Sequence, residues 1–150
     1  MPITTTLNRI RGHGPCASGW ARLWRYVAND FSSDDPLPFA VILASNGLAD
    51  ALWCCRAAPE HDRVWRLFAV WCARRALARV QSPDPRSIAA CDVAERHATG
   101  RATDEALAAA AADAAAAYVA ADAAYVAADA AADAEREAQA AEFLRLVTED

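Results

Sequence analysis

The C-terminal third of this 150-residue chain is dominated by alanine, and this feature most restricts how the chain can fold. From Ala102 to Ala141, 24 of 40 residues are alanine, and neither glycine nor proline follows Gly100. Alanine has the highest intrinsic helix propensity, so such a segment forms helix even where it makes few tertiary contacts. The sequence therefore predicts one long helix, capped by Thr103 and continuing to about Val147. At 1.5 Å per residue this helix would be roughly 65–70 Å long, which is longer than a domain of this size is wide. The helix therefore projects from the body, breaks, or packs against another copy of the chain or a partner.

The predicted long helix contains a seven-residue repeat, because residues 117–123 recur without change as residues 124–130. Helical spacing gathers the tyrosines, valines and aspartates of both copies on one side, and alanine covers most of the rest. The candidate partner-binding residues on this acidic stripe are Tyr118, Asp122, Tyr125 and Asp129.

Two packings of this helix oppose each other. In the first, the alanine face packs against the body or another helix, and the acidic stripe faces solvent or a partner. In the second, the stripe is a buried seam, which brings its carboxylates close to the core. We favour the first, because burying an unpaired carboxylate is costly. A third interpretation is that the repeat persists only because it is helical, with no binding role.

Breaks and caps divide residues 1–101 into shorter helices, and strand signals are nearly absent. The expected helices are Thr6–Arg11, one capped by Ser18, Phe39–Ser45, Leu48–Arg56, Pro59–Gln81 and one capped by Asp84 that ends before Gly100. In the helix over Leu48–Arg56, we expect Leu52, Trp53 and Cys55 to be buried. The predicted fold class is all-α: a compact bundle of five or six helices plus the long alanine-rich helix. We expect one domain overall, with a body over 1–101 and the acidic helix over 102–150.

Charge is divided unevenly along the chain, which contains no lysine. Residues 1–101 hold 13 Arg against 9 acidic residues, a net charge of +4, whereas residues 102–150 carry a net charge of −9. Basic and aromatic residues gather in the helix capped by Ser18, and this second candidate surface contains Trp20, Arg22, Trp24 and Arg25. Aromatic and basic side chains together can contact a nucleic acid strand. The acidic pI near 5.1 disfavours that partner.

Motifs for catalysis, cofactors and metals are missing from the sequence. We find no glycine-rich phosphate loop, nucleophile elbow or structural-zinc spacing, and we expect no enzyme activity, cofactor or metal. If the chain were an enzyme, Cys16, Cys91 or His97 would be the residues to test. The odd number of cysteines, with no Cys-x-x-Cys pair, indicates reduced thiols. No apolar run approaches the ~18 residues of a membrane span, and no secretory signal is recognisable, so we expect a cytoplasmic protein without membrane partners.

Two stretches carry a resemblance to a known group of proteins. They are residues 3–11 (ITTTLNRIR) and residues 84–96 (DPRSIAACDVAER), the latter followed by Gly100 and the alanine-rich segment. They resemble small immunity proteins of phages, prophages and GC-rich bacteria. The resemblance implies a mobile-element origin and a function exerted by binding a toxin or a host defence complex. A small acidic phage protein also fits an anti-CRISPR protein, whose carboxylates occupy an arginine-lined nucleic-acid channel.

The sequence thus predicts a non-catalytic, protein-binding inhibitor that neutralises a toxin or a host defence complex. Its contact surface is expected to be the acidic stripe or the Trp/Arg surface. The alternative is a nucleic-acid-binding regulator that uses the Trp/Arg surface. A homodimer through the long helix is a further option that the sequence leaves open.

Overall fold

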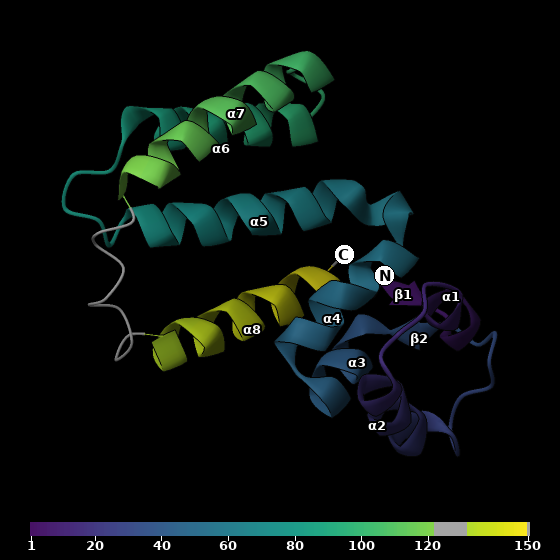
Figure 1. Ribbon diagram of the computed structural model, residues 1–150. Coiled ribbons are helices and arrows are strands. Elements are labelled where there is room, and N and C mark those ends of the chain that lie inside the picture. The colour runs from purple at the N-terminus through teal and green to yellow at the C-terminus, as the bar shows by residue number, and fades with distance from the viewer. Residues whose placement is uncertain (122–131, 150) are drawn as a thin grey trace. The chain divides into compact units, whose positions relative to one another are not determined.

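The computed structural model describes residues 1–121 and 132–149, with the backbone alone for 116–121 (Figure 1). These residues form eight α-helices, two short 3₁₀ helices and one two-stranded sheet, so the predicted all-α class is confirmed. The elements are β1 (Thr4–Thr5), α1 (Leu7–Gly12), α2 (Ala17–Val27), β2 (Leu37–Pro38), α3 (Phe39–Asn46), α4 (Leu48–Cys54), η1 (Cys55–Ala57), η2 (Pro59–His61), α5 (Asp62–Leu77), α6 (Pro85–Ala98), α7 (Asp104–Ala121) and α8 (Ala132–Thr148). They belong to two compact units: unit 1 contains Met1–His61 and Ala134–Asp150, and unit 2 contains Asp62–Asp133.

The N-cap residue of helix α2 lies two residues before the predicted cap. Cys16 is its N-cap residue, and the Cys16 Sγ accepts a hydrogen bond from the Gly19 N–H at 3.3 Å. The prediction of Ser18 as the cap was wrong, because Ser18 already lies inside the helix, whereas Cys16 has the extended backbone that an N-cap requires. The preceding helix α1 was predicted over Thr6–Arg11; Thr6 is its N-cap residue, whose hydroxyl accepts a hydrogen bond from the Arg9 N–H at 3.1 Å.

Helices α3 and α4 are joined by Gly47 alone. The φ angle of Gly47 is +84°, in the region that favours glycine, so this residue ends α3 and starts α4 without a longer loop. The inner face of α4 is formed by the small residues Ala51 and Cys54, while the side chain of Leu52 is 38% exposed. The predicted burial of Leu52 was therefore wrong. Ala51 and Cys54 are three positions apart and share the buried face of α4, and Leu52 does not lie on that face.

The N-terminal strand joins distant parts of unit 1. Strands β1 and β2 pair antiparallel, with Thr4 opposite Pro38 and Thr5 opposite Leu37. Two-residue strands are too short to produce an apolar/polar alternation, which is why the sequence showed no strand signal here. The Ile3 N–H also donates to the Val147 carbonyl at 2.9 Å, so the strand connects to the end of α8 (Figure 1).

The end of the alanine-rich segment is part of the unit 1 core. Phe143 in α8 has no exposed surface, and its ring lies edge-on to the ring of Phe39 in α3, with centroids 6.3 Å apart. Val147, one turn further along α8, is also buried. Helix α8 therefore contributes large apolar side chains to the core, not an alanine surface alone.

Unit 2 is built from α5, α6 and α7, with α6 packed against both of the others. The predicted caps are confirmed: the Asp84 carboxylate accepts the Arg86 N–H at 2.8 Å, and the Thr103 hydroxyl accepts the Ala106 N–H at 3.2 Å. Arg74 of α5 donates to two carboxylates on α6, at 2.9 Å to Asp92 and 2.5 Å to Glu95. These acidic residues thus pair with a neighbouring helix as well as facing solvent.

The structure describes the two ends of the predicted long helix as α7 and α8, which belong to different units. Residues 122–131 lie outside the described residues, so helical continuity across them stays a prediction. The uneven charge along the sequence does not follow the two units. Unit 1 combines 7 Arg with 10 acidic residues, a net charge of −3, and unit 2 combines 8 Arg with 10, a net charge of −2.

Candidate functional site

All four residues of the predicted Trp/Arg surface lie on α2, but they point to different sides of this helix. Leu23 and Val27 form its buried face. At about 100° per residue, Arg22 and Trp24 project about 160° apart. Trp24 stacks on Trp20, one turn earlier, with ring centroids 6.1 Å apart and an interplanar angle of 24°. The structure therefore divides the predicted surface into an aromatic side and a basic side.

The basic side of α2 is exposed around a shallow hollow lined by Ser18, Arg22, Arg25 and Tyr26, which we name the α2 basic face. The Tyr26 side chain is 58% exposed. In the described part of the chain, no carboxylate lies within 4.0 Å of either guanidinium, and the Arg25 Nε donates only to the carbonyl of Ala21 on the same helix, at 3.3 Å.

Two other arginines of unit 1, Arg9 and Arg145, are paired with carboxylates. The Arg9 guanidinium donates to both carboxylate oxygens of Glu60, at 2.6 and 2.8 Å, and Arg145 pairs with Glu142 on its own helix and with Glu149 directly after the helix end. Through the first of these pairs, Arg9 lowers the pKa of Glu60 to about 2, mainly by hydrogen bonding. By contrast, the α2 basic face presents positive charge that no described carboxylate neutralises.

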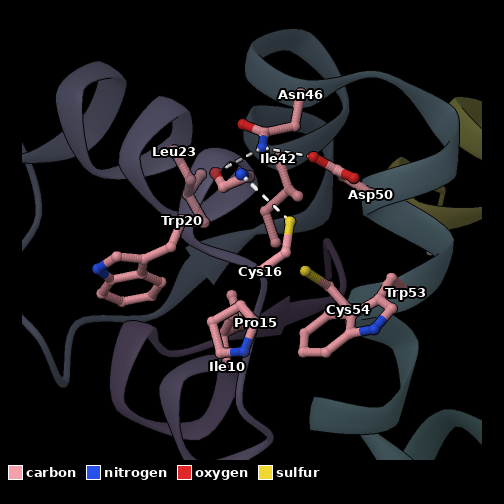
Figure 2. Close-up of a pocket in the computed structure, with 11 residues that line it drawn as sticks. Ile10, Pro15, Cys16, Trp20, Leu23, Ile42, Asn46, Asp50, Trp53 and Cys54 are labelled. Atoms are coloured by element: carbon pink, nitrogen blue, oxygen red, sulfur yellow. Dashed lines mark hydrogen bonds between the residues drawn. The ribbon is translucent and has the colours of Figure 1, made fainter.

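On the aromatic side, Trp20 lines a cavity of about 170 Å³ enclosed by α1, α2, α3 and α4 (Figure 2). Trp20 and Trp53 lie on opposite sides of this pocket, while Asn46 and Asp50 lie at one edge (Figure 2). The remaining lining is mostly apolar and includes Ile10, Pro15, Leu23, Ile42 and Cys54. The pocket is therefore apolar with a single polar edge.

Hydrogen bonds at the polar edge connect three helices. The Asn46 Nδ2 donates to the Gly19 carbonyl at 2.9 Å and to the Asp50 Oδ2 at 2.8 Å (Figure 2). Gly19 leaves room for this arrangement, because a Cβ there would lie 3.1 Å from both the Asp50 Oδ2 and the Cys16 Sγ, which is a tight contact. The absence of a side chain at residue 19 lets a carboxylate and a thiol approach the first turn of α2 together.

The two thiols that line the pocket differ in acidity. The pKa of Cys16 is lowered, chiefly by the hydrogen bond from the Gly19 N–H and then by Ser18, and its side chain is exposed. Burial raises the pKa of Cys54 to about 12, and the charge of Asp50 adds to that shift. The sequence signal for Cys16 was its position after Gly14-Pro15, directly before a helix, where a thiolate is favoured.

The other residues named for a catalytic alternative lie in unit 2. Cys91 is buried in α6, and burial raises its pKa. The His97 Nε2 lies 2.6 Å from the Asp104 Oδ1 at the start of α7. Within the described residues, no group of His, Cys, Asp and Glu side chains is arranged to hold a metal ion. None of the described helices has the length and apolarity needed to cross a bilayer.

The acidic stripe cannot be placed on this structure. Asp122, Tyr125 and Asp129 lie outside the described residues, and only the backbone of Tyr118 is described, in α7. The choice between the alanine face and the stripe as the buried side therefore stays a prediction.

The fold and the site define an all-α protein with an exposed basic face and an adjacent apolar pocket, both built on α2. The chain matches no family model, no curated protein and no solved structure.

Proposed function

We propose that this chain acts by binding and inhibiting a partner protein, with the α2 basic face as the main contact. The observation that carries the proposal is the exposure of Arg22 and Arg25, without a described carboxylate partner, beside the exposed ring of Tyr26. Arginine and tyrosine are enriched among the residues that anchor protein interfaces. Acidic side chains of a partner would complete the charge pairs that the chain itself leaves open.

The proposed partner is a toxin or a component of a host defence complex, as the resemblance to phage immunity proteins implies. In either version, the α2 basic face would pair with an acidic surface of the partner. The geometry of the α2 basic face does not favour one version over the other. The partner's identity therefore has to come from capture followed by quantitative binding.

We expect the double substitution Arg22→Glu/Arg25→Glu to weaken binding to the captured partner by about 100-fold or more. Reversing both charges removes two charge-assisted hydrogen bonds and places like charges against the acidic partner surface. Capture from host lysate with quantitative mass spectrometry identifies the partner, and calorimetry on the purified pair then gives the dissociation constant.

The matched control is Arg63→Glu/Arg96→Glu, which makes the same change in net charge at two exposed helix positions in unit 2. This variant should bind the partner as the original chain does. Equal weakening by both double variants would show that net charge, not the α2 basic face, controls binding, and the proposal would then be wrong.

A separate prediction concerns the contribution of the acidic stripe to partner binding. If it forms part of the contact, Asp122→Arg/Asp129→Arg should weaken binding about 10-fold or more, because charge reversal opposes a basic partner surface. The control is Asp113→Arg/Glu137→Arg, which reverses two exposed acidic residues of α7 and α8. Affinity unchanged by the first pair would remove the stripe from the interface and leave the α2 basic face as the contact.

The alternative function, nucleic-acid-binding regulation, depends on the same two arginines. It predicts that the original chain retards DNA or RNA in gels at moderate salt, and that Arg22→Glu/Arg25→Glu abolishes the retardation. The acidic pI near 5.1 opposes such binding. Retardation without any captured protein partner would favour this alternative over the proposal.

A further inference from the structure

The pocket between α1, α2, α3 and α4 contains a carboxylate that no described cation neutralises. Asp50 is half-buried at the polar edge, and its Oδ2 accepts one hydrogen bond from Asn46. In the described part of the chain, no arginine or histidine nitrogen lies within 4.0 Å of it. Asp50 lies in the first turn of α4. The pocket therefore carries negative charge at one edge.

The remaining walls favour an aromatic ring. Trp20 and Trp53 lie on opposite sides of the pocket, with Ile42 and Leu23 between α2 and α3 (Figure 2). An apolar cavity of about 150 Å³ can bind benzene, so the 170 Å³ here suffice for one ring on a short stem. The nearby guanidinium of Arg56 lies over the Trp53 ring, 4.3 Å from its centroid, and does not line the pocket.

We propose that this pocket is a binding site for a small arylalkyl amine, whose ammonium group pairs with Asp50 and whose ring lies between Trp20 and Trp53. An ammonium donor to a carboxylate makes a charge-assisted hydrogen bond, which is stronger than a neutral one. The indole rings add aromatic contact and attract the adjacent positive charge. The site is distinct from the α2 basic face, which has the opposite charge and does not depend on the pocket.

Three probes of similar shape and different charge test the proposal on the original chain: phenethylammonium, 2-phenylethanol and 3-phenylpropionate. Binding is measured by NMR titration of the indole N–H signals of Trp20 and Trp53. We expect the amine to bind about tenfold more tightly than the alcohol, and the carboxylate to bind most weakly. Equal affinities for amine and alcohol would overturn the role of Asp50, and no binding by any probe up to about 10 mM would overturn the site.

A pair of matched variants then locates the charge. Asp50→Asn keeps an oxygen that can accept the Asn46 hydrogen bond and should remove the preference for the amine over the alcohol. Asp30→Asn removes one exposed carboxylate outside the pocket lining and should leave that preference unchanged. Loss of the preference in both variants, or in neither, would contradict the assignment to Asp50. Because no partner protein is present, the outcome is independent of the α2 basic face.

Discussion

Replacing Phe143 with alanine is expected to lower the free energy of unfolding of unit 1 by about 3–5 kcal/mol. The Phe143 ring is fully buried and meets the ring of Phe39 edge-on, with centroids 6.3 Å apart. Truncation removes a large apolar group and leaves a cavity that the surrounding helices fill only partly. It also removes the aromatic pair, which contributes beyond the buried area. The change is measured by urea unfolding, followed by circular dichroism and tryptophan fluorescence.

The neighbouring residue provides the control. The Leu144 side chain is 41% exposed, so Leu144→Ala should change the free energy of unfolding by less than about 1 kcal/mol. A small effect of Phe143→Ala, or equal effects of both substitutions, would contradict the packing of α8 in the core of unit 1. It would also indicate that α8 is helical because of its alanine content alone.

Cys16 is expected to react with iodoacetamide far faster than the buried Cys54 of α4 and the half-buried Cys55 of η1. Alkylation proceeds through the thiolate, and the lowered pKa of Cys16 makes more thiolate available at a given pH. With pKa values of about 12, Cys54 and Cys55 hold only about one thiolate in 10,000 molecules at pH 8, and burial restricts access further. The difference in rate should therefore exceed about 1,000-fold. Peptide mapping by mass spectrometry after timed quenching measures it.

The pH dependence tests the cause of this reactivity. Because the Gly19 N–H and Ser18 stabilise the thiolate, the midpoint of the Cys16 rate profile should lie below that of an unstructured cysteine peptide. Cys16→Ser should remove the fast phase. A midpoint at or above that of the peptide would contradict the N-cap geometry, and a fast phase that survives in Cys16→Ser would place the reactive thiol elsewhere.

Helix positions and most caps could be predicted because they depend on neighbouring residues. Asp84 and Thr103 cap their helices as expected, since a side-chain oxygen and a backbone N–H two or three residues later suffice for the interaction. Gly47 ends α3 for an equally local reason, its positive φ. The error at Leu52 has a tertiary cause, because the exposure of Leu52 depends on what packs against α4.

The candidate site could be predicted only in part. The sequence indicated α2 as a helix rich in tryptophan and arginine, but the apolar pair Leu23 and Val27 sets its orientation and thereby directs the two residue types to different sides. The pocket could not be predicted, because residues as far apart as Ile10 and Trp53 form its walls only when four helices pack together.

The alanine-rich segment separates what local helix propensity determines from what tertiary contacts determine. Its composition by itself determined that residues on both sides of 122–131 are helical, because alanine propensity acts within a few residues along the chain. Only the tertiary structure decided that α7 packs on α6 in unit 2, while α8 enters the core of unit 1. That choice rests on contacts such as Phe143 with Phe39, which bring together residues about 100 positions apart. The burial of such apolar pairs stabilises an arrangement that helix propensity cannot specify.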